Sequence, residues 1–180
     1  MALTRINNQT LTNVTSAGLP TGSVVQVKSY TMGNKVAHPD SDGNTENDVM
    51  SGTITPNSSS NDILVMVNIH SGGTDRYLTF YLYRNSTKIG IPSARGNRTP
   101  SFMTNASASD GASGDQYILD TASKQFLDSP ATTSEITYKV TMNNTANDSR
   151  AFYINATHND SNNAYTVTGQ CTLILMEIAR

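Results

Sequence analysis

The sequence predicts an all-β protein, an antiparallel β-sandwich of the jelly-roll type, on three observations. Charged residues make up only 14% of the 180 residues, well below the usual level of about 25%. Polarity comes instead from Asn, Ser and Thr, which favour turns and β-surfaces over helices. Short apolar or β-branched runs recur between turn signals, and the chain closes on the apolar run Cys171–Ile178, which a folded protein buries.

The closing run Cys171–Ile178 is predicted to be a strand deep in a sheet. Two leucines alternate there with three other apolar side chains, so both faces of the strand are apolar. One face can meet the core of the domain, and the other needs a second cover, for which a neighbouring copy of the chain is the simplest candidate. The residues expected to make that contact are Ile174, Met176 and Ile178.

Residues 1–22 form a polar arm ahead of a single domain, 23–180. The arm carries few apolar side chains, spaced among Asn and Thr. We expect another chain or another protein to hold it, and a first strand on its own domain is the alternative. The anchoring candidates are Leu3, Ile6, Leu11 and Val14.

The first half of the domain is expected to hold three strands before its clearest one. Segment 23–32 is β-branched and alternating, and a long polar loop, 33–51, follows it. A short strand at 52–55 and a turn at 56–61 precede a strand at 63–70, and a turn at 71–75 follows.

Segment 77–84 shows the cleanest alternation in the chain. Its core face is Leu78, Phe80 and Leu82. Its other face is a ladder of tyrosines, Tyr77, Tyr81 and Tyr83. Tyrosines with an apolar body and a polar tip favour an interchain packing face. A carbohydrate-stacking face that includes Arg84 is the alternative.

The second half of the domain is expected to begin with a short strand at 89–91 and a long loop. Segment 92–115 is too poor in apolar residues to form an element, and loops of that length are usually functional or wrapped on a partner. Short strands are expected at 117–119, 125–127, 136–142, 151–155 and 165–168. About ten strands at such spacings predict a sandwich.

A metal site is not expected from the spacing of the possible ligands. The acidic segment Asp40-x-Asp-x-Asn44 departs from an EF-hand loop, because its sixth and twelfth positions hold Thr45 and Ser51. A solvated loop is therefore favoured over calcium. The three histidines, His38, His70 and His158, lie on different segments, and Cys171 has no second cysteine.

No enzyme or cofactor is expected. The chain lacks a Gly-x-Ser-x-Gly elbow and a phosphate-binding glycine loop. Five acids lie in or beside predicted loops, where solvation explains them, although a glycan-cleaving pair needs only to meet in space. These acids are Asp110, Asp115, Asp120, Asp128 and Glu135. A net charge of −2 gives no footprint for nucleic acid, and no apolar span of membrane length occurs.

Several motifs resemble one family of proteins. They are Gly-Leu-Pro-Thr-Gly-Ser-Val-Val-Gln-Val at 18–27, Ile-Thr-Pro-Asn-Ser-Ser-Ser-Asn-Asp-Ile-Leu-Val-Met at 54–66, Leu-Tyr-Arg-Asn-Ser-Thr-Lys-Ile-Gly at 82–90, Phe-Leu-Asp-Ser-Pro at 126–130 with Tyr-Lys-Val at 138–140, and Leu-Met-Glu-Ile at 175–178. The chain is similar here to modules of tailed bacteriophages, especially marine and cyanobacterial ones, labelled tail-fibre or virion structural proteins. The resemblance implies a trimeric knob and carries no catalytic residue.

The resemblance leads us to expect an exterior protein of a tailed phage particle, assembled in the host cytoplasm. As a capsid decoration protein, it would grip the major capsid protein through its arm and bridge neighbouring subunits with its knob. The short arm shows no repeat typical of a fibre shaft, so we expect the knob to sit directly on its target.

The alternative is a tail-fibre tip. Its arm would dock on a tail adaptor, and its loops 33–51 and 92–115 would recognise a host glycan or protein. Exposed aromatic side chains are expected in such loops, and Phe102 is the only one there, which favours decoration. An unrelated cellular β-sandwich is the third possibility.

Overall fold

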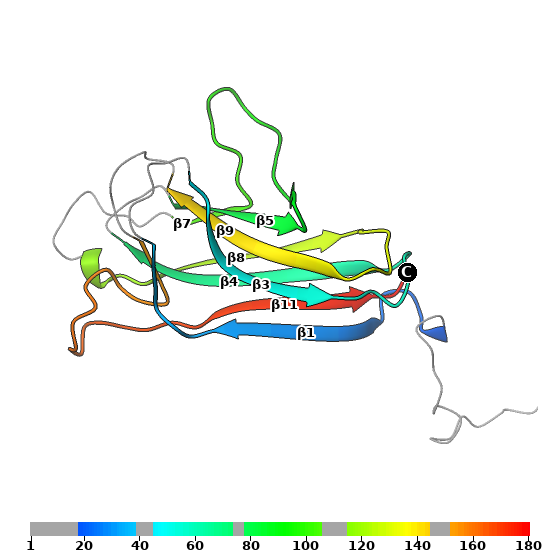
Figure 1. The fold of residues 1–180 in the computed structure, drawn as a ribbon, viewed down its shortest axis with the longest axis horizontal. Coiled ribbons are helices and arrows are strands. Elements are labelled where there is room, and N and C mark those ends of the chain that lie inside the picture. The colour runs from blue at the N-terminus through cyan, green and yellow to red at the C-terminus, as the bar shows by residue number, and fades with distance from the viewer. Residues whose placement is uncertain (1–17, 39–44, 74–77, 106–114, 145–151) are drawn as a thin grey trace, which may run out of the picture.

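The structure is a computed structural model that describes residues 18–38, 45–73, 78–105, 115–144 and 152–180. These residues form two antiparallel sheets whose strands run along the long axis of the molecule (Figure 1). Within the described ranges, eleven strands and one short helical turn, η2 (Asp115–Tyr117), make up the regular structure. No helix in this part of the chain is long and apolar enough to cross a membrane.

The first sheet has six strands, in the order β1-β11-β4-β10-β2, with β8 pairing on β4. Their bounds are β1 Val24–Met32, β2 Val36–His38, β4 Asp62–Gly73, β8 Asp120–Asp128, β10 Phe152–Ile154 and β11 Cys171–Ile178. The second sheet has five strands, in the order β3-β9-β5-β6, with β7 pairing on β5. Their bounds are β3 Asn47–Ile54, β5 Leu78–Arg84, β6 Thr87–Ile89, β7 Met103–Asn105 and β9 Ile136–Asn144.

The strand pairs are nested in the manner of a jelly roll. The first strand, β1, pairs with the last, β11, and β3 pairs with β9. Inside these, β4 pairs with β8 and β5 with β7. Pairing of outer with outer and inner with inner strands is what two stacked Greek keys produce. The predicted fold class, an antiparallel β-sandwich of the jelly-roll type, is therefore confirmed.

The core lies between the two sheets and follows from the alternation of each strand. On β11 the residues facing inward are fully buried, including Leu173 and Leu175, whereas the intervening ones are only half-buried. On β5 the predicted core face of Leu78, Phe80 and Leu82 is buried as expected. On β11 and through most of β4, a side-chain period of two separates a core face from an outer face.

Tyr30 links the edge strands of the two sheets along one side of the sandwich. Here β1 is the edge strand of one sheet and β3 that of the other. The Tyr30 hydroxyl donates to the carbonyl oxygen of Thr53 at 2.5 Å and accepts from the amide of Thr53 at 2.9 Å. Its ring packs on Gly52, where any Cβ atom would overlap it. A side chain of β1 therefore does for β3 what a neighbouring strand does elsewhere.

Four expectations about individual segments were wrong. The segment 33–51 contains β2 and the first half of β3, and 92–105 contains β7. Segment 117–119 begins at the last residue of the helical turn η2 and is not a strand. Segment 165–168 makes a single bridge, between Thr168 and Ala156. Strands of three residues carry too little pattern to be recognised alone, because their partners in the sheet decide them.

Candidate interaction surface

A row of apolar side chains crosses the outer face of the six-stranded sheet. Val27 lies opposite Met176, which lies opposite Leu64, which lies opposite Leu127, so that four neighbouring strands each contribute one residue. Val27 is 51% and Leu127 53% exposed, and the two central residues are half-buried. All four alternate with core residues of their strands, so they point away from the core.

Four more apolar residues border this row. On one side Ile174 lies opposite Met66, and on the other Val24 lies opposite Ile178. Together these eight residues, Val24, Val27, Leu64, Met66, Leu127, Ile174, Met176 and Ile178, form what we call the apolar face. It ends at a polar row, Thr31, Thr172, Asn68 and Ser123. The apolar face thus occupies the end of the sheet nearest the C-terminus (Figure 1).

The structure places the three predicted contact residues of the closing strand within the apolar face. Ile174, Met176 and Ile178 point outward from β11 and are half-buried in the single chain. The strand itself lies between β1 and β4, as a strand deep in a sheet should. Contact with a neighbouring copy stays a prediction for these residues.

Glu177 lies on the inner side of the closing strand and is completely buried. Its carboxylate accepts hydrogen bonds from Gln26 Nε2 at 2.6 Å and from Asn61 Nδ2 at 2.7 Å. The backbone amides of Asn57 and Ser58 donate at 2.7 and 3.3 Å. Burial by itself raises the pKa of Glu177, but these donors outweigh it and hold the pKa below the usual value.

Glu177 therefore fixes the turn at 56–61 to the end of the sheet that carries the apolar face. From the sequence alone, Glu177 reads as one more residue of an apolar run, and this role does not show. The available signal was an acid inside a buried strand together with an Asn- and Ser-rich turn that offers amide donors.

Asp128 joins the two sheets, and the expectation that solvation explains it was wrong. It ends β8 in the six-stranded sheet and is only 6% exposed. From the other sheet, Arg84 Nη1 donates to both carboxylate oxygens at 2.8 and 3.1 Å, and the Tyr138 hydroxyl donates at 2.7 Å. Burial and the bond to Asp128 raise the pKa of Tyr138, so the phenol stays a donor. The contact is a clasp between sheets.

The remaining acids of the catalytic alternative are not brought together in the described structure. Asp120 is half-buried, and burial raises its pKa, whereas Glu135 is exposed. Asp110 and the side chain of Asp115 lie outside the described residues. The buried acid Asp62 is bonded by Arg180 Nε at 2.8 Å and Ser129 Oγ at 2.6 Å.

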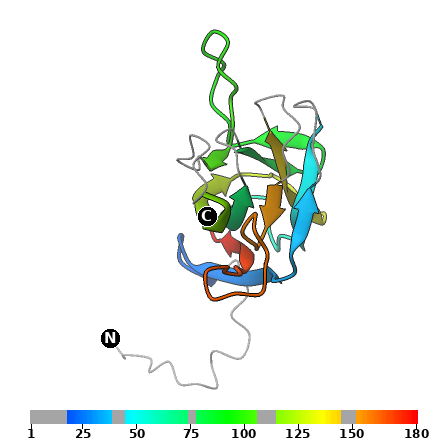
Figure 2. The ribbon, with the colours of Figure 1, turned by 90° about the vertical axis from the view of Figure 1, so that its left-hand side faces the viewer.

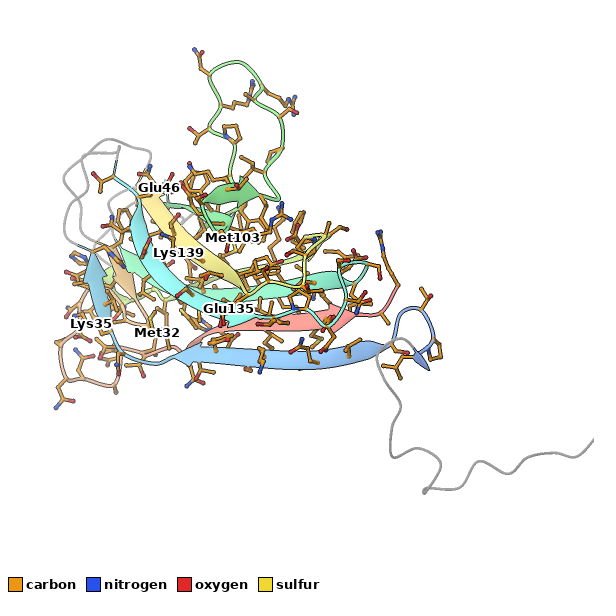
Figure 3. All side chains as sticks on the ribbon, turned by 45° about the vertical axis from the view of Figure 1, so that its right-hand side comes forward. Met32, Lys35, Glu46, Met103, Glu135 and Lys139 are labelled. Carbon is orange, nitrogen blue, oxygen red and sulfur yellow. The ribbon has the colours of Figure 1, made fainter. Side chains whose placement is uncertain are left out.

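The tyrosine ladder is covered by side chains of the same chain. Tyr81 is 5% exposed, because the Lys88 ammonium lies 3.7 Å from its ring centre. Lys88 also pairs with Glu46, which accepts a hydrogen bond from the Tyr83 hydroxyl at 2.6 Å. Figure 3 shows Glu46 and Lys139 on this sheet. Tyr77 lies outside the described residues.

Arg84 lies on the opposite side of β5 from the tyrosines, toward Asp128, so it does not join them in a sugar-stacking face. An interchain role for Tyr81 and Tyr83 stays a prediction.

The possible metal ligands remain apart in the described structure. His38 is buried in β2, His70 faces Thr121 with its Nδ1 atom 2.8 Å from the hydroxyl, and the ring of His158 packs edge-on against Tyr153. Among the described residues no three His, Cys, Asp or Glu side chains form a possible metal site. Residues 39–44 of the acidic loop lie outside the described residues.

The arm and the long loop differ in how much of them the structure describes. Leu3, Ile6, Leu11 and Val14 lie outside the described residues. The root of the arm is fixed beside the C-terminus, where Gly22 N donates to Ala179 O at 2.8 Å. Phe102, the aromatic residue of the predicted recognition loop, is 2% exposed and packs edge-on against Phe126.

The chain is similar to the VP2 subviral particle of infectious bursal disease virus, at 12% identity and a TM-score of 0.37, over 88% of this chain and 39% of that one. It is also similar to the structure of the Gx strain of that virus, at 9% identity and a TM-score of 0.39, over 87% and 38%. This chain spans about two fifths of those chains, and the likeness is one of fold. No protein-family model and no curated protein matches it.

Proposed function

We propose that this chain is a non-enzymatic structural protein on the exterior of a virus particle, and specifically a trimeric capsid decoration protein of a tailed phage. The observation that carries the proposal is the apolar face. A contiguous apolar surface of four strands marks a protein contact, because a soluble chain that works alone keeps such patches small. The phage assignment draws on the motifs at 18–27, 54–66 and 175–178.

A second copy of the chain is the proposed occupant of the apolar face. Val27 and Leu127 keep about half of their surface exposed, and burying that remainder contributes about 1 kcal/mol each. A closed ring of copies brings the same face of every copy to one axis. The apolar centre of this face and its polar border match the core and rim of a stable interface.

The carboxylates of the sandwich support a structural role. Glu177, Asp128 and Asp62 are all buried, and each accepts hydrogen bonds that hold loops or sheets together. Their lone pairs are committed to the fold. Because these buried carboxylates have hydrogen-bond partners, they stabilise the end of the sandwich that carries the apolar face. Such an end suits a structural protein.

Decoration works by linkage. A protein that binds the assembled shell and not its separate subunits stabilises the shell by mass action. In this proposal the arm, with Leu3, Ile6, Leu11 and Val14, contacts the major capsid protein, and its root beside Ala179 sets where the arm leaves the knob.

Two measurements test the proposal. Light scattering of the purified protein at micromolar concentration is expected to give three times the 19.3 kDa chain mass, and a monomer would remove the second copy as occupant. Quantitative mass spectrometry of purified particles is expected to give a copy number comparable to the major capsid protein. A few trimers per particle would instead make the chain a tail-fibre tip.

The tail-fibre tip is kept as the second candidate because one loop, 90–102, projects from the sandwich (Figures 1 and 2). Its single aromatic residue, Phe102, is buried, so a glycan finds no exposed ring to stack on in this loop. The copy number separates the two candidates.

A further inference from the structure

The loop between β6 and β7, residues 90–102, stands clear of both sheets in two perpendicular views (Figures 1 and 2). Residues 91–99 are all exposed. From 85 to 105 the chain contains no Asp or Glu, so every charge on the loop is positive. The loop rises on the side away from β1, which helps to form the apolar face (Figure 1).

The base of this loop is fixed by one residue of the other sheet. Lys124 on β8 donates to Gly90 O at 3.2 Å and to Phe102 O at 2.6 Å, and so holds the two ends of the loop together. Its ammonium also lies 4.5 Å from the ring centre of Phe102. Pro92 and Pro100 restrict the backbone just above this base. Both ends of the loop are therefore held in place by the sandwich.

The tip of the loop is a tight hairpin with an arginine on each side. Arg95 and Arg98 form an antiparallel bridge, with Arg98 N donating to Arg95 O at 3.3 Å. Gly96 has a φ of 60°, which the first central position of a type II′ turn requires. Bridged residues of a hairpin present their side chains on the same face. The side chains of Arg95 and Arg98 therefore start from the same face of the hairpin.

Within the described ranges, these two cations lack the acidic partner that most of the other lysines and arginines have. Lys35, Arg84, Lys88, Lys139 and Arg180 all pair with a carboxylate. Arg98 Nη1 donates only to a backbone oxygen, that of Arg95 at 3.2 Å, and neither guanidinium meets an acid in the described structure. Like charges placed opposite each other in a hairpin cost stability. A bound anion relieves that cost.

We propose that this loop, which we call the arginine hairpin (residues 90–102), docks the protein on an acidic patch of another protein. Carboxylates match the fork of donors on arginine, and arginine is enriched at the centres of protein interfaces. Nucleic acid would require a long basic track or aromatic stacking, and the loop offers two adjacent cations and no exposed ring. The fixed base lowers the entropy lost on binding.

The test uses poly-L-glutamate as the carboxylate probe and polyphosphate of similar length as the phosphate probe. Binding of each labelled polymer to the full-length protein is followed by fluorescence anisotropy at low and physiological salt. The variant is Arg95→Ala with Arg98→Ala. The matched control is Lys28→Ala, which removes an exposed cation on β1, remote from the hairpin.

The double variant is expected to bind poly-L-glutamate at least about tenfold more weakly, and the Lys28→Ala control within about twofold of the unaltered protein. The thermal midpoint of the double variant should equal or exceed that of the unaltered protein. The substituted tip is exposed, and the repulsion between the two arginines is removed. Arg95→Lys with Arg98→Lys keeps the charges but loses the fork, and an intermediate affinity is expected.

Equal binding by the double variant and the control would overturn the proposal. Hairpin-dependent binding of polyphosphate without binding of poly-L-glutamate would overturn the assignment to a protein partner. Neither readout depends on whether the protein is a trimer, so failure here is distinct from failure of the proposed function.

Discussion

Tyr30 and Thr53 form a two-way hydrogen bond across the open side of the sandwich, in which the phenol both donates to the carbonyl and accepts from the amide of the same residue. An edge strand with free backbone groups invites pairing with another chain. By occupying the donor and acceptor of Thr53, Tyr30 joins the edges of the two sheets. The contact requires the ring to lie on the backbone at Gly52.

Gly52→Ala is expected to destabilise the protein by about 1–3 kcal/mol, because the added methyl group overlaps the ring of Tyr30 and pushes it off Thr53. Urea unfolding followed by tyrosine fluorescence measures the change. Gly33→Ala is the matched control, since a Cβ atom there lies 3.7 Å from its nearest neighbour. Equal stability of the two variants would show that Tyr30 moves aside freely.

Glu177→Gln is expected to lower the free energy of unfolding by about 1–3 kcal/mol at neutral pH. The NH2 group of the new side chain faces hydrogen-bond donors, whereas the carboxylate oxygen accepted hydrogen bonds from them. The pKa of Glu177 is lower in the folded protein than in the unfolded chain. Its stabilisation is therefore complete above the unfolded pKa and is lost as the pH falls through the folded pKa.

Urea unfolding of both proteins from neutral to strongly acidic pH checks this prediction. The difference in unfolding free energy between them should shrink as the pH falls. Glu135→Gln, at an exposed position, should stay within about 0.5 kcal/mol of the unaltered protein throughout. A difference that is constant with pH would contradict an ionised, buried Glu177.

Asp128→Ala is expected to destabilise by about 2–3 kcal/mol, because it leaves the buried Tyr138 hydroxyl and the partly exposed Arg84 without their acceptor. Tyr138→Phe removes one donor only and should cost about 1 kcal/mol. Thermal unfolding by circular dichroism compares them. If Tyr138→Phe costs as much as Asp128→Ala, the ion pair with Arg84 contributes nothing.

Met176→Glu is expected to convert the proposed trimer to a folded monomer, because it places a charge at the centre of the apolar face. Thr172→Glu is the control on the same strand and the same outward side, within the polar row, and should leave the oligomer intact. Light scattering reports the mass and circular dichroism the fold. Dissociation by both variants alike would locate the contact elsewhere on the sheet.

The sequence was sufficient for the long strands and for the fold class. Cys171–Ile178 was predicted to the residue, and β1 and β9 nearly so, because each shows an alternation longer than four residues that needs no partner to be recognised. The strands β2 and β7 have three residues each and exist through their pairing with β10 and β5. Local pattern does not contain that information.

The residues of the apolar face also divide into those that local alternation predicts and those that only strand pairing reveals. The outward residues of β11 were identified from alternation, whereas Val27 and Leu127 join them only through strand register, which pairs Val27 with Met176 and Leu127 with Leu64. The roles of Glu177 and Asp128 were missed because buried acids are recognised by their donors, and those donors come from distant turns and strands. The arginine hairpin could not be predicted from the sequence, because only the structure shows the bridge between Arg95 and Arg98.

The place of β11 between β1 and β4 has a consequence for synthesis. Until the last eight residues of the sheet emerge from the ribosome, β1 has no neighbour in its sheet and the six-stranded layer is split. Folding of the six-stranded sheet therefore waits until Cys171–Ile178 has been synthesised, as expected for strands joined over so long a stretch of chain. A chain interrupted before residue 171 would leave β1 without a partner and one edge of β4 open, and such unpaired strand edges make an incomplete chain prone to aggregation.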